Sequence, residues 1–373
     1  MTVPQVIDPQ RPRPVLAVAA CDFGWGSFGK LRVILDELPD VDFALVAGAH
    51  AAEVIDRLLG ARHSFVEIDL MEADAALVIN DPSVANHFAE EGLHVVYVDS
   101  LPYLWTTPEE VPISVDVYCA QRTPGGEPAT SGPLAARDDI VWVEPIVPRP
   151  VPLGASSGIV VNVGGLHSHL SGRAEDAYIQ LVLLPLVELL LDQGRHVSAV
   201  CGNIPEWTII ELGRKIPHAA LGLQNAYAFH DLVRAADLLF TSPGSTTLLQ
   251  AVTSGVRTIA LPPQNLSQIL NATLFRGHTE ATVPWPESVL DLRVVEGKRP
   301  LGEDPVLEHI YGELIRAASS PELKAQVRDS LADLTLTLPE QDRSVAMSPL
   351  ENGGAEQVAR HINDLLAGLR SRS

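Results

Sequence analysis

The chain alternates short, unbroken apolar runs with segments of helical spacing, and this pattern is what most constrains its fold. Residues 14–20 (PVLAVAA) form the first apolar run, residues 30–38 have helical spacing, and residues 41–48 form the second run. Unbroken apolar runs indicate strands that are buried on both faces of a sheet, as in parallel sheets. Strands that alternate with helices in this way predict a doubly wound parallel α/β sheet.

The alternation continues, stops and then starts again. It runs on through a helix at 49–60, a strand at 75–80, a helix at 83–92 and a strand at 93–100. A polar loop at 123–139 and a proline-rich stretch at 143–158 interrupt it, and we place a linker near 145–156. The sequence therefore predicts two Rossmann-like domains, an N-terminal one over 1–150 and a C-terminal one over 151–345.

The second round begins with residues 158–165 (GIVVNVGG), a predicted strand that ends in a glycine pair. The later predicted strands are 195–203, 237–242 and 256–263, and the helices between and after them are 177–194, 229–236, 245–255 and 265–277. The last third has no strand pattern, and its amphipathic segments 304–319 and 356–369 predict helices.

Composition narrows the class of protein. The three cysteines form no CxxC pair, which favours a reducing compartment and disfavours a zinc site or a disulfide framework. The start of the chain shows no secretory signal, and the apolar run 181–191 is too short to span a bilayer, so we expect a cytoplasmic protein without a membrane partner. The formal net charge of −21 disfavours nucleic acid but permits a small anionic ligand.

The first glycine-rich loop, residues 24–29 (GWGSFG), follows the first predicted strand and has the spacing G-x-G-x-x-G. A nicotinamide-binding enzyme would carry an acidic residue at the end of the second strand, but that strand ends LVAGAH and the nearest carboxylate is Glu53. The pattern thus disfavours a dehydrogenase. The glycines can also serve only to turn a strand into a helix, yet polar side chains gather where ligands of open α/β sheets bind.

The stretch 240–275 carries the more specific signal. Its loop SPGS follows a strand and opens a helix, so backbone N–H groups at Gly244, Ser245 and Thr246 would face an anion such as a diphosphate. Gln250 lies further along the same helix, within reach of a ribose. Gln268 and Asn271 share a face of the next helix, where paired amides suit sugar hydroxyls.

These residues resemble the donor half of GT-B glycosyltransferases, the superfamily of UDP-sugar transferases and of the peptidoglycan N-acetylglucosaminyltransferase. The resemblance rests on G-S-x-T-x-x-Q, G-V-x-T-I-A-L-P and Q-x-x-N-A, with Gln250 where the family usually has Glu. It implies two domains that face each other across a cleft, with a C-terminal helix in 346–373 packing back on the first domain. The donor-binding residues that it implies are Gly164, Gly165, Phe229, Pro243, Gly244, Ser245, Thr246, Gln250, Gln268 and Asn271.

The segment 21–31 (CDFGWGSFGKL) departs from the usual form of that superfamily and is similar to cytosylglucuronate synthases of peptidyl-nucleoside antibiotic pathways. Those enzymes move glucuronic acid from UDP onto cytosine. The resemblance implies that this loop faces the acceptor, and the acceptor-binding residues are then Gly24, Trp25, Gly26, Ser27 and Lys30. Trp25 could stack on a planar acceptor, although packing in the core is an equal alternative.

Sugar transfer also needs a base that takes the acceptor's proton. Asp22, at the end of the first strand, is our first candidate for base or acceptor orienter, and a turn-capping role is the alternative. His167 is the other catalytic candidate. Helix N-termini can stabilise the leaving diphosphate, so we expect no metal and no cofactor beyond the UDP-sugar co-substrate.

Two other functions fit the same residues. One is a UDP-sugar epimerase, which would turn its substrate over without an acceptor, and the other is a non-catalytic subunit that binds a nucleotide sugar. The partners expected in each case are small molecules, and a homodimer is compatible with all of them.

Overall fold

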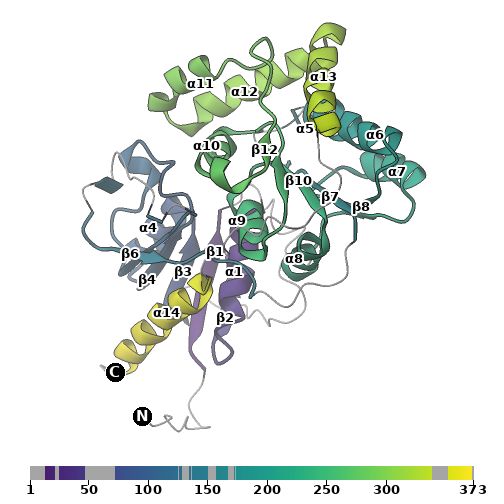
Figure 1. Cartoon of the computed structure of the whole chain (residues 1–373). Helices are drawn as coiled ribbons and strands as arrows, with labels where there is room; N and C mark the ends of the chain where they lie inside the picture. The colour runs from purple at the N-terminus through teal and green to yellow at the C-terminus, as the bar shows by residue number, and fades with distance from the viewer. Residues whose placement is uncertain are drawn as a thin grey trace.

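The computed structural model describes residues 13–21, 25–46, 72–124, 126–127, 134–135, 137–149, 157–166, 172, 174–337 and 352–371. These residues form two six-stranded sheets, in which every paired strand runs parallel to its neighbour. Helices cover both sheets (Figure 1). The predicted fold class, α/β with two Rossmann-like units, is confirmed.

The first sheet has the strand order β2-β1-β3-β4-β5-β6. Its strands are β1 (Val15–Ala20), β2 (Asp42–Leu45), β3 (Ala75–Ile79), β4 (Val95–Asp99), β5 (Val117–Gln121) and β6 (Ile140–Val143). Its described helices are α1 (Gly26–Leu35) and α4 (Pro82–Glu90). Together with α14, described below, these elements form what we call the first half.

The second sheet has the order β12-β11-β10-β7-β8-β9. Its strands are β7 (Ile159–Asn162), β8 (Val197–Cys201), β9 (Ala220–Gly222), β10 (Leu238–Thr241), β11 (Thr258–Ala260) and β12 (Ala281–Thr282). The helices of this second half are α5 (Ala174–Tyr178), α6 (Leu184–Asp192), α7 (Glu206–Lys215), α8 (Ala226–Ala235), α9 (Ser245–Ser254), α10 (Leu266–Leu274), α11 (Leu292–Lys298), α12 (Glu303–Ala318) and α13 (Pro321–Thr337).

Each sheet has one point at which the strand order reverses. In the first half it lies between β1 and β3, and in the second half between β7 and β10. Ligands of open parallel sheets bind beyond the carboxyl ends of the strands at such a point. The loops that follow β1, β3, β7 and β10 are therefore where the fold favours a site.

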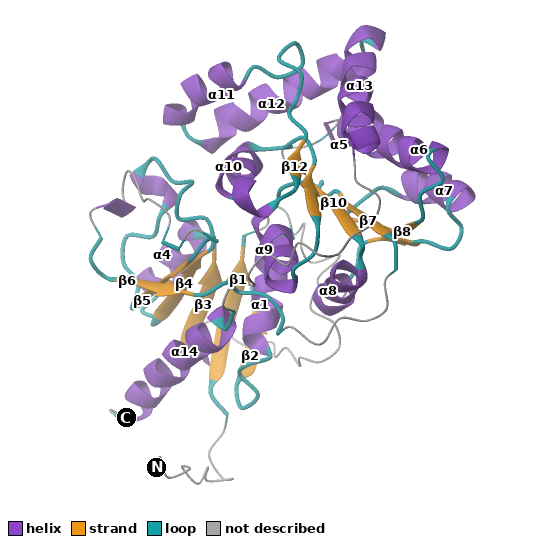
Figure 2. Ribbon diagram, in the orientation of Figure 1, coloured by secondary structure: helices purple, strands orange, loops and turns teal. Residues whose placement is uncertain are grey.

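The last helix, α14 (Gly354–Arg370), packs on the first half, against α1 and strands β4, β5 and β6 (Figure 2). Its apolar face, Val358, Ile362 and Leu366, joins the core of the first sheet. Gly354 lies so close to the segment after β6 that a Cβ there would come within 1.9 Å of the Glu144 carbonyl oxygen. A residue without a side chain is thus required where the helix docks.

Several local predictions need correction. The helix predicted at 30–38 spans Gly26–Leu35, because the chain turns into the helix within the glycine-rich loop itself. Strands β5, β6, β9 and β12 and helices α7, α11 and α13 were not predicted; β9 has only three residues and β12 two, too few to show a pattern. The long helix predicted at 177–194 contains a π-helical turn at Ile179–Leu183, just before Pro185, whose missing N–H favours such a turn.

Other predictions fall outside the described residues: the helix at 49–60, and residues 150–156 of the linker. The limits of the two domains remain a prediction. Among the described residues, no helix is both long and apolar enough to cross a membrane.

Candidate functional site

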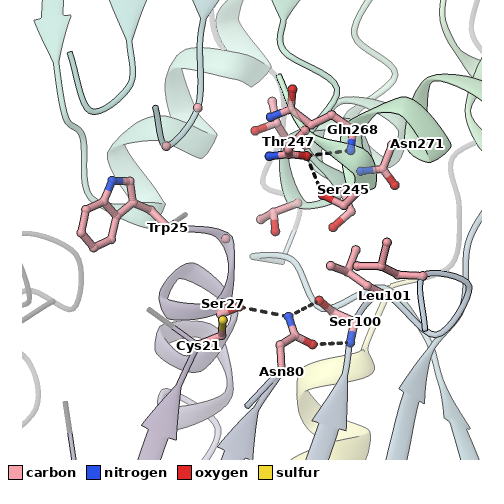
Figure 3. Close-up of a pocket in the computed structure, with 18 of the residues that line it drawn as sticks. Cys21, Trp25, Ser27, Asn80, Ser100, Leu101, Ser245, Thr247, Gln268 and Asn271 are labelled. Carbon is pink, nitrogen blue, oxygen red and sulfur yellow. Dashed lines mark hydrogen bonds between the residues drawn. The ribbon is translucent and has the colours of Figure 1, made fainter. Parts of the chain in front are cut away.

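The carboxyl edges of the two sheets meet around a pocket of about 160 Å³, here called the central pocket (Figure 3). From the first half it is lined by the start of α1 and by residues that follow β3 and β4. From the second half it is lined by the loops after β7 and β10 and by α10. Both reversal points of strand order therefore open on the same space.

A second pocket of about 110 Å³, the side pocket, adjoins the first. The two pockets share lining residues: Trp25, Gly26, Asn162, Gly164, Gly165, Thr246 and Thr247. The side pocket extends from this shared wall toward α8 and the loop before it, where Phe229, Gln224 and Leu223 line it. One elongated ligand could thus occupy both pockets.

Helix α9 begins at the junction of the two pockets. Its N-cap is Gly244, and no side chain caps the helix. Ser245 lines the central pocket and Thr246 lines both pockets. The first N–H groups of a helix have no partner within the helix, and the helix dipole adds partial positive charge, so this end can bind an anion.

The glycine loop after β7 is fixed to α9 by Asn162. Its amide Nδ2 donates to Thr241 Oγ1 at 3.0 Å and to Thr247 Oγ1 at 3.2 Å, and its Oδ1 accepts from the Gly164 N–H at 3.2 Å. Gly202 lies against this loop with φ of +137°, and a Cβ there would come within 2.8 Å of the Gly164 carbonyl oxygen. The loop is therefore held in place before any ligand arrives. No sequence motif marked Asn162, although its place at the end of a buried strand was a signal.

Gln250, predicted to face a ribose, lines the side pocket together with Phe229. Its side chain is 3% exposed, and its Oε1 has no hydrogen-bond partner within the described part of the chain. A buried acceptor without a partner is costly, which is a reason to expect a ligand donor at this oxygen.

Gln268 and Asn271 both line the central pocket, as the sequence predicted, but their side-chain amides have different hydrogen-bond partners. Gln268 Oε1 accepts from the Gln264 N–H at 2.8 Å. Asn271 Nδ2 donates to the Pro243 carbonyl at 2.8 Å, and its Oδ1 accepts from the phenol of Tyr103 in the first half. Asn271 therefore positions the loop that precedes α9. Pro243 itself does not line either pocket and contributes through its carbonyl group.

Asn80 organises the wall that the first half contributes. It follows β3 with φ of +55°, a left-handed conformation that is uncommon outside glycine. Its Nδ2 donates to Ser27 Oγ at 3.0 Å and to Ser100 Oγ at 2.8 Å, and its Oδ1 accepts from the Ser100 N–H at 2.8 Å (Figure 3). Such strain collects at functional sites. From the sequence, this residue was predicted only as the end of a strand.

Asp99 supports the same wall from behind. It is fully buried, and its carboxylate accepts from Trp105 Nε1 at 2.9 Å, Tyr118 OH at 2.7 Å and the Leu101 N–H at 2.9 Å. Burial raises the pKa of Asp99 to about 6, although these hydrogen bonds act in the opposite direction. The group fixes Leu101 and Trp105, which line the central pocket. The sequence pattern placed Asp99 only within the strand predicted at 93–100, and no motif marked its role.

Lys30 lines the central pocket with the other predicted acceptor residues and reaches across to the second half. It was expected to face an acceptor, but its Nζ donates to Thr246 Oγ1 at 2.5 Å, at the start of α9. The side chain is 1% exposed, and burial lowers its pKa to about 7. Gly26, one turn earlier, approaches the same Thr246 hydroxyl, which a Cβ would meet at 3.0 Å.

The remaining predicted residues divide into two groups. Trp25, Gly26 and Ser27 line the central pocket, as do Gly164, Gly165, Gly244 and Ser245. Asp22, Gly24 and His167 lie outside the described residues, so the two predicted catalytic groups stay predictions.

Glu303, which no sequence motif marked, is the first residue of α12 and also lines the central pocket. It is the one acidic side chain among the described residues that line either pocket. Burial, and then the neighbouring charges of Glu110 and Asp304, raise the pKa of Glu303 to about 7. A carboxyl group that titrates near neutrality can accept a proton from a substrate. Within the described ranges, no three His, Cys, Asp or Glu side chains are grouped so that they could hold a metal ion.

No protein-family model and no curated protein matches this chain. Among solved structures it is similar to MurG of Acinetobacter baumannii, with 14% identity over 95% of this chain and 100% of that one and a TM-score of 0.46. A UDP-glucosyltransferase from Polygonum tinctorium matches with 14% identity, 95% and 99% coverage and a TM-score of 0.47. The spinosyn rhamnosyltransferase SpnG matches with 12% identity, 94% and 99% coverage and a TM-score of 0.48.

Proposed function

We propose that this chain is a glycosyltransferase that moves a sugar from a UDP-sugar to a small acceptor held in the central pocket. The observation that carries the proposal is the uncapped start of α9, which opens on a pocket whose opposite wall belongs to the other sheet. A group-transfer enzyme with two substrates needs such a space between two binding surfaces.

The lining of the two pockets favours one orientation of the donor on the second half. The diphosphate would lie at Gly244–Thr246, where backbone N–H groups and the helix dipole supply positive charge, so that no metal ion is required. The ribose would reach Gln250 Oε1, and the base would enter the side pocket beside Phe229. The sugar would then lie in the central pocket near Gln268.

The acceptor would lie against the wall that Asn80, Leu101 and Trp105 build. In the transfer, the acceptor atom forms a bond to the anomeric carbon, and the bond from that carbon to the diphosphate oxygen breaks. UDP leaves with the electron pair of the broken bond, and a protein group takes the acceptor's proton. Asp22 and His167 are the predicted groups, and Glu303 is a third candidate because it lines the pocket and titrates near neutrality.

The finer assignment names glucuronic acid as the sugar and cytosine as the acceptor, which places the reaction in nucleoside-antibiotic biosynthesis. It rests on the resemblance of residues 21–31 to cytosylglucuronate synthases. Trp25 supports it, since its indole lines the space where a planar acceptor would stack.

The test is UDP release by the purified protein. UDP-glucuronic acid, UDP-glucose and UDP-N-acetylglucosamine are each supplied with and without cytosine. Release that requires both UDP-glucuronic acid and cytosine is the expected result. Release with another donor would retain the transferase and reject the finer assignment, whereas conversion of a UDP-sugar without an acceptor would indicate the epimerase.

The base is identified by comparing Asp22→Asn, His167→Ala and Glu303→Gln. The variant that removes the base should lower kcat by about 100-fold or more while UDP still binds. If all three turn over like the wild type, none of these groups takes the proton.

A further inference from the structure

Lys30 differs from the other charged side chains buried in the described part of the molecule. Arg32 pairs with Asp36, Arg234 pairs with Asp231, and Asp99 accepts three hydrogen bonds. Lys30 has no ion pair within the described residues, and its only hydrogen-bond partner there is the Thr246 hydroxyl. A buried ammonium group without a counter-ion is strongly disfavoured, so this position calls for an explanation.

The position of Lys30 explains why this lysine is buried without a counter-ion. Its Nζ lies 2.5 Å from Thr246 Oγ1, in the first turn of α9, and both residues line the central pocket. The lysine belongs to α1 of the first half, whereas the helix N-terminus belongs to the second half. An unpaired cation and an uncapped helix N-terminus thus converge from opposite sides on one place, and both favour an anion.

We propose that Lys30 binds the diphosphate of the donor from the first half, and that it takes up a proton when the diphosphate replaces Thr246 as its partner. This inference rests on the proposed function, because it takes the ligand to be a nucleoside diphosphate sugar. It moves Lys30 from the acceptor group to the donor group, and it makes the first half part of the donor site.

The surroundings of Lys30 leave few groups that could produce the same proton uptake. Helix α9 and strand β1 carry no ionisable side chain. Helix α8 contacts α1 through Tyr227, which donates to Asp36 and lies under the Arg32 guanidinium. Helix α14 also packs on α1, and its Glu356 pairs with Arg149, which pairs in turn with Glu37 just after α1. In the pocket itself, Cys21 and Glu303 are the other described ionisable groups.

Burial lowers the pKa of Lys30 to about 7, so above that pH the side chain is neutral in the empty pocket. A diphosphate beside it favours the charged form and raises the pKa. Below about pH 7 the lysine is already charged, and binding takes up no proton there. Above it, each unit of pH should weaken diphosphate binding by up to about tenfold, until the pKa of the complex is reached.

The experiment is calorimetric titration with UDP and with uridine, from pH 6 to pH 9, in buffers of different ionisation enthalpy. Wild-type protein should take up close to one proton per UDP near pH 8, and none with uridine. Lys30→Met should bind UDP about 10- to 100-fold more weakly at pH 7, with no lysine-dependent uptake. Its uridine affinity should be unchanged. The ionisation of UDP itself is common to both proteins and cancels in the comparison.

Two further variants complete the test. Lys30→Arg stays charged at every pH used, so it should bind UDP with the pH dependence removed, and it decides the question if Lys30→Met does not fold. Lys215→Met removes a paired lysine of α7 and should behave as the wild type does.

Equal UDP affinity and equal proton uptake in wild type and Lys30→Met would overturn the inference and leave the proposed function intact. Failure of the wild type to bind either UDP or uridine would reject the proposed function, and with it the inference.

Discussion

The carboxyl edges of the two sheets face one pocket but are built in different ways. In the second half the edge consists of two backbone loops, after β7 and β10, which Asn162 ties together. In the first half the edge consists of side chains from three segments: Ser27 in the first turn of α1, Asn80 after β3 and Ser100 after β4. Asn80 links the other two by hydrogen bonds. The second edge presents the backbone N–H groups at the start of α9 together with hydroxyl and amide side chains, whereas the first edge presents hydroxyl, amide and apolar side chains.

This difference suits two kinds of ligand. A diphosphate is the same in every nucleotide sugar, and a fixed array of N–H groups binds it without regard to the sugar. Acceptors vary, and side chains from separate strand ends can be exchanged one by one to suit them. Lys30 connects the two edges, since its side chain extends from α1 in the first half to Thr246 in the second.

The largest effect is expected from Lys30→Met on the stability of the ligand-free protein. Burial lowers the pKa of Lys30 to about 7 in the fold, from 10.5 for an exposed lysine. The folded state therefore binds fewer protons than the unfolded state between these pH values, and wild-type stability rises with pH across that range. Lys30→Met should be more stable than wild type by on the order of 5 kcal/mol below pH 7, and the difference should vanish near pH 10.5.

Urea unfolding of both proteins at pH 6.5 and pH 10 measures this difference. A variant that is less stable than the wild type at pH 6.5 would show that the buried lysine has a counter-ion.

Gly202→Ala should damage the second edge. The position has φ of +137°, and a Cβ would meet the Gly164 carbonyl at 2.8 Å, so the glycine loop must shift. We expect a loss of about 2–3 kcal/mol in the free energy of unfolding and at least about a tenfold rise in the Kd for UDP. The matched control is Gly213→Ala in α7, where a Cβ has ordinary contact at 3.7 Å and no such loss should follow.

Substitutions at Asn80 test the first edge, as Gly202→Ala tests the second. Asn80→Ala removes the hydrogen bonds and strains the left-handed backbone, whereas Asn80→Gly removes only the hydrogen bonds. We expect the alanine variant to be less stable than the glycine variant by about 1 kcal/mol. In kinetic assays both should raise the acceptor KM and leave the Kd for UDP unchanged. A weaker UDP complex would break the division between the two edges.

Gln250→Leu should give the smallest effect: it should weaken UDP binding without lowering the stability of the protein. The buried Oε1 has no partner among the described residues, so its loss should not destabilise the protein. The ribose would lose an acceptor, and UDP affinity should fall by about tenfold. Gln193→Leu is the control, because Gln193 Nε2 donates to Thr335 at 2.9 Å, far from nucleotide-binding loops along the chain. It should lower stability and leave UDP binding alone.

The contrast between the edges also explains what the sequence could reveal. The motif SPGS and the glycine pair after β7 predicted the second edge. Each of these loops is one continuous stretch of residues, so its binding role is visible as a local sequence motif. The parallel α/β fold followed from the apolar runs for the same reason, although the short strand β9 carried too little pattern to be read.

Of the first edge, only the loop at Trp25–Ser27 could be predicted in this way. Asn80, Ser100 and Trp105 come together only through the order of the strands, and no local spacing records it. The same holds for Lys30, whose partner Thr246 is 216 residues away along the chain. Its buried state depends on the approach of the two halves, which sequence periodicity does not describe.

Hydrogen exchange with and without UDP tests the central claim, the separate roles of the two edges, most directly. Backbone amides in residues 162–166 and 243–250 should exchange more slowly when UDP is bound. Amides in residues 80–86 and 100–106, behind the acceptor wall, should be unchanged until an acceptor is added. Protection by UDP of the segments after β3 and β4 alone, or of no segment, would contradict the account.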